Sequence, residues 1–179
     1  GLPFQFQTWH EFEAFVADQK TTGIIDHINE IRWDIRPSPH LGTIEVRVCD
    51  GMTNLVELSG VVALIHCLVV DLDRRLSAGD ELPHMAPWLV QENKWLAARY
   101  GLDAIVILDS DCDERLVTDD LTVLLKRLEP VAEDLGCLDD LARVVDIVDH
   151  GASYQRQRSV HDRTGDMRAV VASVVAELD

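Results

Sequence analysis

Apolar side chains spaced three and four positions apart predict helices along most of the chain. In residues 9–22 they recur on one helical face, and Thr8 just before them can cap the backbone amide of Glu11. Gly23 is expected to close this helix, because glycine accepts the left-handed conformation found after many helix ends. The first element is therefore expected to be a scaffolding helix.

The rest of the chain carries similar helix signals. Residues Leu55–Leu76, opened by Asn54, are apolar on nearly every side, which is typical of a central and buried helix. The remaining expected helices are Trp88–Tyr100 with Pro87 in its first turn, a helix capped by Thr118 that ends near Gly136, Leu138–His150, and Asp166–Leu178.

Two segments alternate apolar and charged residues with a period of two, which predicts an antiparallel hairpin. They are residues 31–36 and 43–48, and the turn-forming residues 37–42 lie between them. A further short strand is expected at residues 104–108. We therefore predict an α+β chain in which several helices pack with a small antiparallel sheet, all within one domain.

Composition narrows the possible partners. The 179 residues carry 32 acidic and 16 basic side chains, a formal charge of −16, and 47% are hydrophobic, enough for a sizeable core. An acidic chain repels phosphates, so we expect no nucleic-acid partner. The longest apolar run, residues 58–70, falls short of the roughly 20 needed to span a bilayer, so no membrane partner is expected. No signal peptide is expected, and the missing initiator Met suggests a fragment.

The cysteines and the acidic stretch offer little sign of metal chemistry. The four cysteines form no CxxC pair, which favours free thiols and a cytoplasmic location. Asp109, Asp111, Asp113 and Asp120 match positions of a calcium loop, but Glu114 stands where the tight turn requires glycine. A solvated acidic turn explains the stretch equally well. The sequence contains no P-loop or dinucleotide motif.

The charged face of the predicted hairpin is the strongest candidate site. Arg36, Glu45 and Arg47 are expected to point to the same side of neighbouring strands, opposite a buried face that includes Ile44. One interpretation is cross-strand ion pairing on a solvated surface, worth roughly 0.2 to 1 kcal/mol per pair. The other is phosphoryl transfer, in which the carboxylate holds a divalent cation and the arginines bind phosphate oxygens.

The hairpin residues resemble a known family. The runs Glu30–Pro37 and Gly42–Asp50 closely resemble the YbdK-type carboxylate-amine ligases of the glutamate-cysteine ligase type 2 family. Arg32 and Ser38 depart from the family pattern, which has a second Trp and a His there. Further matches are Gly1–Pro3, Glu92–Trp95, Ala98–Asp103, and Gly151–Ser153 with Arg156 and Arg158. The resemblance implies that residues 1–179 are the C-terminal half of a single catalytic domain whose N-terminal half lies outside the chain.

The resemblance implies a glutamine synthetase-like catalytic fold and an ATP-dependent ligase. Magnesium and arginine position the γ-phosphate, a carboxylate attacks it, and an amine displaces phosphate from the acyl phosphate. Glu45 matches the family's metal ligand and Arg47 its phosphate-binding arginine, while Arg36 is expected to contact substrate carboxylate or phosphate. The implied cofactors are ATP and Mg²⁺.

Other implied site residues are Trp33 and Asp34, which match the family's substrate or nucleotide pocket. Arg156 and Arg158 are expected either to reach the nucleotide or to orient the start of a helix. Glutamate and cysteine are the family's nominal substrates, a homo-oligomer is expected, and this chain alone is expected to be inactive. The alternative is a non-catalytic helical interaction or regulatory domain that retains the hairpin.

Overall fold

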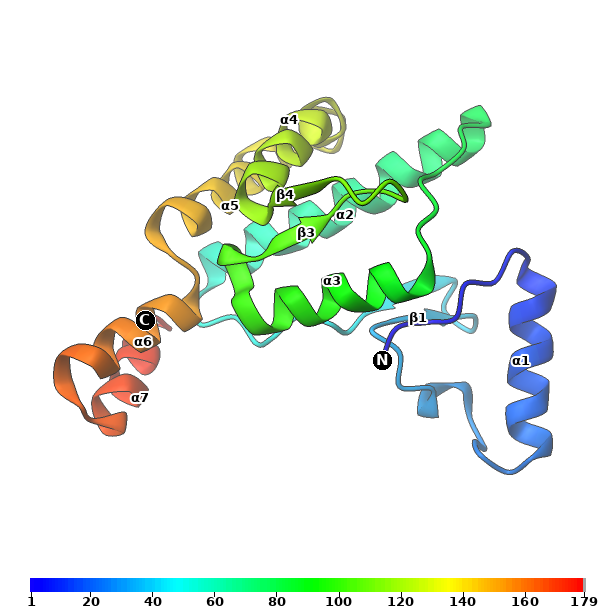
Figure 1. Cartoon of the computed structure of the whole chain (residues 1–179), viewed down its shortest axis with the longest axis horizontal. Helices are drawn as coiled ribbons and strands as arrows, with labels where there is room; N and C mark the ends of the chain where they lie inside the picture. Colours follow the sequence, from blue (N-terminus) through cyan, green and yellow to red (C-terminus); the bar gives the residue numbers. More distant parts are fainter. Residues whose placement is uncertain (179) are drawn as a thin grey trace. The chain divides into compact units, whose positions relative to one another are not determined.

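The chain is described here by a computed structural model covering residues 1–178 (Figure 1). It divides into two compact units, residues 1–51 and a second unit from Met52 onward, and each is described by itself. The described residues form α-helices, two short 3₁₀ helices and two separate two-stranded antiparallel sheets. This mixture of helices and small antiparallel sheets confirms the predicted α+β class.

The first unit consists of a helix followed by a hairpin. Thr8 caps the helix as predicted, because its Oγ1 accepts a hydrogen bond from the Glu11 amide at 3.2 Å. Glu11 in return accepts from the backbone N–H of Gln7 at 2.9 Å, so both residues stabilise the helix start. The elements are α1 (Trp9–Thr21), η1 (Ile28–Glu30), β1 (Ile35–Ser38) and β2 (Thr43–Val46).

The hairpin is shorter than its alternating pattern, and its one buried strand residue is Arg36. The predicted first strand begins only at Ile35, because residues 28–30 form a 3₁₀ turn. Ile44 was expected to be buried but is 58% exposed, whereas Arg36 is only 8% exposed. The guanidinium of Arg36 tolerates burial because carbonyl and carboxylate oxygens surround it. The prediction of a buried apolar face including Ile44 was therefore wrong.

The core of the second unit lies among three helices, α2 (Leu55–Ala78), α4 (Val117–Leu135) and α5 (Leu138–His150). Asn54 caps α2 as predicted and accepts from the Glu57 amide at 2.8 Å. In Figure 1, α4 and α5 run alongside α2, and each packs against the other two. The buried cluster between them consists of Ala63, Cys67, Leu128, Val131, Ala132 and Leu141.

A second hairpin packs beside α3 (Pro87–Tyr100), which ends in η2 (Gly101–Asp103). Its strands are β3 (Ile105–Ile107) and β4 (Glu114–Leu116), and β4 was not predicted. Asn93 of α3 binds the backbone of Ile107 in both directions, donating to its carbonyl and accepting from its amide, each at 2.7 Å. This side chain occupies an edge of the sheet that is otherwise unpaired.

The acidic stretch between these strands forms a turn. Asp109 Oδ1 accepts from the amides of Asp111 at 3.0 Å and Asp113 at 3.2 Å, and Cys112 adopts a positive φ of 64°. The helix that follows begins at Val117, whose amide binds the carbonyl of Ala104 at 2.9 Å. The N-cap is Leu116, so the prediction that Thr118 caps this helix was wrong.

The second unit ends in a pair of packed helices, α6 (Ser153–Thr164) and α7 (Met167–Ala176). The last predicted helix corresponds to α7, and its N-cap Asp166 accepts from the Arg168 amide at 2.8 Å. Helix α6 was not predicted, because its sequence carries almost no apolar side chains. Tyr154 of α6 accepts from the Leu102 amide at 3.0 Å and so ties this helix to η2.

Helix α2 differs from the other helices in its length and apolar composition. It is long and apolar enough to cross a membrane by those two criteria alone, a test that core helices of other proteins also pass. Its Cys67 is fully buried, and its Sγ lies 3.7 Å from the Sγ of Cys137. Burial and the adjacent thiol raise the pKa of Cys67 to about 11, which keeps it protonated. All four cysteines are free, as predicted.

Candidate functional site

The hairpin of the first unit brings three predicted site residues together. The strand register places Arg36 directly opposite Glu45. Arg36 Nη2 lies 2.5 Å from Glu45 Oε2, and Arg47 Nε lies 3.6 Å from Glu45 Oε1. One carboxylate is therefore held between two guanidinium groups, on the shared side that the alternation predicted.

Arg36 is the buried member of this group. Its Nη1 donates to the carbonyls of Asn29 and Ile31, the latter at 3.1 Å, and its Nη2 donates to the Glu45 carboxylate. A buried charge is stable only when it is paired and hydrogen-bonded, and all three acceptors meet that need. These bonds fix the guanidinium plane and, through it, the position of the Glu45 carboxylate. Contact of Arg36 with substrate stays a prediction.

Arg47 is more accessible than Arg36. Its side chain is 36% exposed, and its Nη1 donates a hydrogen bond to the carbonyl of Ile31 at 3.3 Å. Its backbone amide donates to Asp34 at 2.7 Å, which holds residues 34 and 47 side by side beyond the end of the regular ladder. The contacts of the Arg47 side chain with Glu45 and Ile31 are longer than those that Arg36 makes with the same two residues.

Arg47 lines a cavity in this unit, which we call the polar pocket. The cavity has a volume of about 890 Å³, within the range of small-molecule sites. Trp33 and Asp34 also line it, so three of the predicted site residues border one cavity. The other lining residues are Phe4, Phe15, Gln19, Ile24, Ile25, Asn29, Glu30, Ile31 and Arg32.

The hairpin motif did not indicate the polar groups that η1 and α1 contribute to this pocket. Glu30 accepts hydrogen bonds from the amides of Asp26 at 3.2 Å and His27 at 2.9 Å, and these bonds hold together the loop of residues 26–30. Asn29 lies one residue before it and Gln19 comes from α1. None of these residues sits in a strand, so alternation could not place them. The only sequence signal was that Glu30 opens the family-like run.

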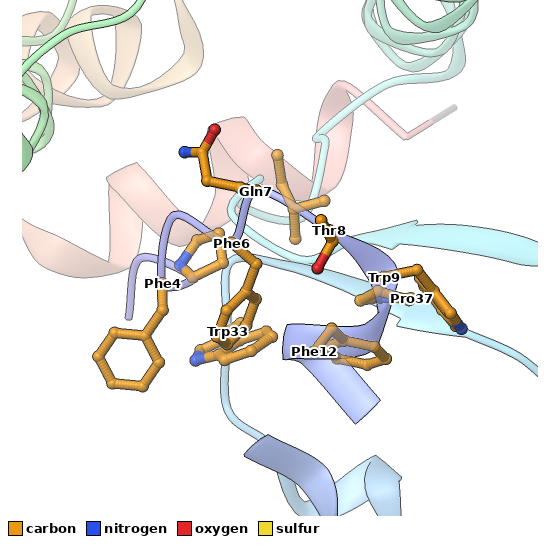
Figure 2. Close-up of a pocket in the computed structure, with 10 residues that line it drawn as sticks. Phe4, Phe6, Gln7, Thr8, Trp9, Phe12, Trp33 and Pro37 are labelled. Carbon is orange, nitrogen blue, oxygen red and sulfur yellow. The ribbon is translucent and has the colours of Figure 1, made fainter. Parts of the chain in front are cut away.

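A second cavity of about 390 Å³ lies against the same tryptophan and is lined by aromatic rings (Figure 2). Trp33 stacks on Phe15 with centroids 5.1 Å apart and packs against Phe6 and Phe12 at 6.0 and 6.1 Å. Ile35 and Pro37 of β1 also line this cavity, on the side of the strand away from Arg36. Trp33 thus borders both cavities and is held in place by its aromatic neighbours.

Arg156 belongs to the second unit and joins three helices. Its Nη1 lies 2.6 Å from Glu57 at the start of α2, and its Nη2 lies 2.9 Å from Glu177 after α7. Hydrogen bonds from Arg156, and secondarily from Thr53, hold the pKa of Glu177 below its usual range. The Glu177 and Glu57 carboxylates raise the pKa of the Arg156 guanidinium above its ordinary value. These bonds fit a role in orienting the helix start, and the nucleotide-binding role stays a prediction.

Arg158 lies on the same helix as Arg156 and contacts an aromatic ring. Its guanidinium carbon lies 5.1 Å from the centroid of the Tyr154 ring, a cation–π arrangement. It borders a cavity of about 340 Å³ between α6 and α7. A nucleotide contact of Arg158 likewise stays a prediction.

The metal-binding capacity of the described residues is limited. Within residues 1–178, no group of three or more His, Cys, Asp or Glu side chains could hold a metal ion. Glu45 offers one carboxylate, and Mg²⁺ in nucleotide sites is usually bound through one or two carboxylates together with phosphate oxygens and water. The site therefore fits a partial metal environment, and the assignment of Glu45 as a metal ligand stays a prediction.

Comparison with known proteins decides the family. The model of the glutamate-cysteine ligase family 2 matches residues 1–173. The chain belongs to this family. A curated relative, "Putative glutamate--cysteine ligase 2" of Mycobacterium ulcerans (strain Agy99), is 71% identical over 180 residues, covering 100% of the chain and 46% of the relative.

Other curated relatives give the same coverage. "Putative glutamate--cysteine ligase 2-1" of Mycolicibacterium vanbaalenii is 70% identical over 99% of the chain and 47% of its own length. "Putative glutamate--cysteine ligase 2" of Mycobacterium tuberculosis (strain ATCC 25177 / H37Ra) is 69% identical over 99% of the chain and 48% of its own length. The chain thus spans about half the length of these family 2 relatives.

Proposed function

We propose that this chain supplies part of the active site of an ATP-dependent carboxylate-amine ligase of the glutamate-cysteine ligase type. The observation that carries the proposal is Glu45 held between Arg36 and Arg47, with Arg47 on the wall of a cavity of about 890 Å³. Membership of glutamate-cysteine ligase family 2 and the names of the relatives support the reaction class. The whole active site is proposed to have a glutamine synthetase-like fold, of which the Arg36–Glu45 hairpin is one part.

In the proposed reaction, a substrate carboxylate attacks the γ-phosphate of ATP, and ADP leaves. An amine then attacks the carbonyl carbon of the acyl phosphate, and phosphate leaves as the amide forms. Glutamate and cysteine are the proposed substrates, following the names of the relatives. Trp33 and Asp34 are proposed to form the wall against which substrate or nucleotide rests, because both border the polar pocket.

Arg47 is proposed to bind the transferred phosphoryl group. Its planar guanidinium can bind two oxygens at once, and its exposure and long contacts leave it able to turn into the cavity. Arg36 is proposed to hold Glu45 in place, since its guanidinium is itself fixed by hydrogen bonds to two carbonyls and donates to this carboxylate. A direct contact of Arg36 with substrate would use its Nε or the second hydrogen of Nη2, since both Nη1 hydrogens already bind carbonyls.

Glu45 is proposed to be one of the Mg²⁺ ligands. When bound, Mg²⁺ neutralises negative charge that develops on the transferred phosphoryl group. Phosphate oxygens, water and carboxylates from outside this chain are proposed to complete its coordination. The neighbouring guanidinium groups keep the Glu45 carboxylate in one place without ligand, which prepares the site for a cation and a polyphosphate together.

The test uses a chimera in which this chain replaces the matched half of the M. ulcerans relative. We expect Arg47→Lys to lower kcat on the order of 100-fold while changing KM for ATP much less, because lysine keeps the charge and loses the two-pronged contact with the transition state. Glu45→Gln is expected to remove turnover while the melting temperature stays close to that of the parent. Arg168→Lys, an exposed position on α7, is the matched control. Near-parental turnover of Arg47→Lys, measured as phosphate release, would leave Arg47 as an ion-pair partner only.

A cytoplasmic location and homo-oligomerisation are part of the same proposal. The four free cysteines are consistent with a reducing compartment. The 179-residue chain on its own is proposed to lack turnover, because it spans about half the length of the curated relatives and its residues 1–178 contain no group of three or more His, Cys, Asp or Glu side chains that could hold a metal ion.

A further inference from the structure

Helix α2 carries a continuous row of exposed aliphatic side chains, which we call the apolar stripe. Its members follow one another at alternating steps of three and four residues, so they lie along one face of the helix for its whole length. Leu55 is 77% exposed, Val62 55% and Leu76 59%, and Ile65 is part-exposed. The apolar stripe consists of Leu55, Leu58, Val62, Ile65, Val69, Leu72 and Leu76.

The opposite face of α2 is already covered. Gly60, Ala63 and Cys67 are buried against α4 and α5, and a side chain at Gly60 would stand 3.2 Å from the Cβ of Arg143. Helix α2 is therefore apolar on two opposite faces, of which only one is packed within the described unit. A helix that is apolar all round is typical of one buried on every side in a complete protein.

The residues that flank the stripe indicate what kind of surface covers it. In a helix pair exposed to water, the flanking positions usually carry Glu or Lys, which form ion pairs between the two helices. Here the flanking residues in the first two-thirds of the helix are Ser59, Val61, His66 and Leu68, and none is a permanent charge. The apolar face is thus wider than a coiled-coil seam. A broad partner from a protein core suits it better than the same helix of a second copy.

A bilayer suits the stripe less well. The C-terminal part of α2 carries Asp71, Asp73, Arg74 and Arg75. Its packed face is covered by α4 and α5. Those two helices have many acidic residues, including Asp139 and Asp140 in the first turn of α5. Charged groups are costly in the hydrocarbon core, so this three-helix arrangement does not present an apolar exterior to lipid.

We infer that the apolar stripe is the docking face for the part of the family polypeptide that this chain does not match. The curated relatives have about as many residues again as the matched region, since the chain covers 46–48% of their length. That remaining polypeptide has enough chain to cover a face of seven aliphatic residues. The inference concerns assembly and does not depend on the ligase chemistry proposed for the hairpin.

The experiment co-expresses this chain, tagged, with a polypeptide made of the unmatched part of the M. ulcerans relative. We expect a stable one-to-one complex, measured by size-exclusion chromatography with light scattering. Val62→Glu should reduce the recovered complex at least 10-fold. Val123→Glu, at a 56% exposed valine on α4, should leave it unchanged. Far-UV circular dichroism of each variant shows whether its helices remain folded.

A second, uncharged pair of variants maps the contact even if glutamate disturbs folding. We expect Val62→Cys to react with a maleimide at least 10-fold more slowly in the complex than in the isolated chain, and Val123→Cys to react equally in both, with each site resolved by peptide mass spectrometry. No ATP or substrate is present, so a failed ligase assignment leaves the result unaffected. The inference is overturned if no complex forms, or if Val62→Cys stays reactive within it. Protection of Val62→Cys in a dimer of this chain alone, or only by phosphatidylcholine vesicles, also overturns it.

Discussion

At the scale of single residues, the hairpin site depends on a buried arginine. Arg36 is 8% exposed, yet it makes hydrogen bonds to the carbonyls of Asn29 and Ile31 and to Glu45. The same bonds close the loop that precedes β1 onto the strand. Removing the guanidinium therefore affects both the site and the local fold, because the carbonyl of the buried Ile31 and that of Asn29 lose their donor.

We expect Arg36→Ala to lower the free energy of unfolding by about 1–3 kcal/mol, the range for leaving buried polar partners unsatisfied. The measurement is urea denaturation of the 179-residue chain, followed by tryptophan fluorescence because Trp33 lies nearby. Arg32→Ala, at an exposed neighbouring position, should change it by less than about 0.5 kcal/mol. Equal effects of the two substitutions would show that the Arg36 bonds do not stabilise the native chain.

Residue spacing predicted which residues form this site but not that Arg36 is buried. Alternation along two strands was sufficient to place Arg36, Glu45 and Arg47 on one side, and the register confirms it. It could not predict that Arg36 is buried, because its burial depends on the carbonyls of an irregular turn, residues 28–31. Alternation describes a strand, and such turns leave no periodic signal.

At the scale of elements, Arg156 connects helices that are far apart in sequence. It binds Glu57 near the start of α2 and Glu177 just after α7, and it also donates to the carbonyl of Gly151 at 2.5 Å. Thr53 donates to the same Glu177 carboxylate. The network therefore fixes the start of α2 against the last two helices, and its strength depends on the charge of Glu177.

This dependence predicts a pH effect. Because the native pKa of Glu177 is lowered, its contribution to stability is present above its ordinary pKa of about 4.5 and is lost as the pH falls through the lower native value. Glu177→Gln should therefore reduce the free energy of unfolding by about 1–2 kcal/mol at pH 7, and the difference from the parent should shrink in acid. Urea denaturation from pH 7 down to pH 3 measures it.

The matched control for Glu177 is Glu133→Gln, an exposed position on α4. It should change the free energy of unfolding by less than about 0.5 kcal/mol at every pH. A difference between Glu177→Gln and the parent that stays constant with pH would indicate that the carboxylate charge does not contribute.

The elements that sequence reasoning predicted are those with apolar periodicity or a good cap. Helices α1, α2, α3 and α5 begin within a residue of the predicted start. Helix α6 was missed because Tyr154 and Val160 are nearly its only apolar residues, and it is held by the Arg156 network and by packing on α7. Strand β4 was missed because three residues are too few to show alternation.

At the scale of the whole molecule, the two compact units contain different functional features. The first unit contains the hairpin and the polar pocket, and the second contains the Arg156 network and the apolar stripe. The family resemblance was predicted from the hairpin motif and is confirmed by the match over residues 1–173. The exposure of the stripe could not be predicted, because an apolar run in sequence does not reveal whether its partner lies within the same chain.

The most direct test of the proposed ligase follows an oxygen atom. The chimera is supplied with ATP, Mg²⁺, cysteine and glutamate labelled with oxygen-18 in its carboxylates, and the released phosphate is analysed by mass spectrometry. If a carboxylate attacks the γ-phosphate and an amine then displaces phosphate, the carboxylate oxygen that bonded to phosphorus leaves with it. We therefore expect one oxygen-18 atom in each phosphate released during amide formation. Phosphate without the label, formed together with the amide, would contradict the acyl-phosphate ligase that Glu45, Arg36 and Arg47 are proposed to serve.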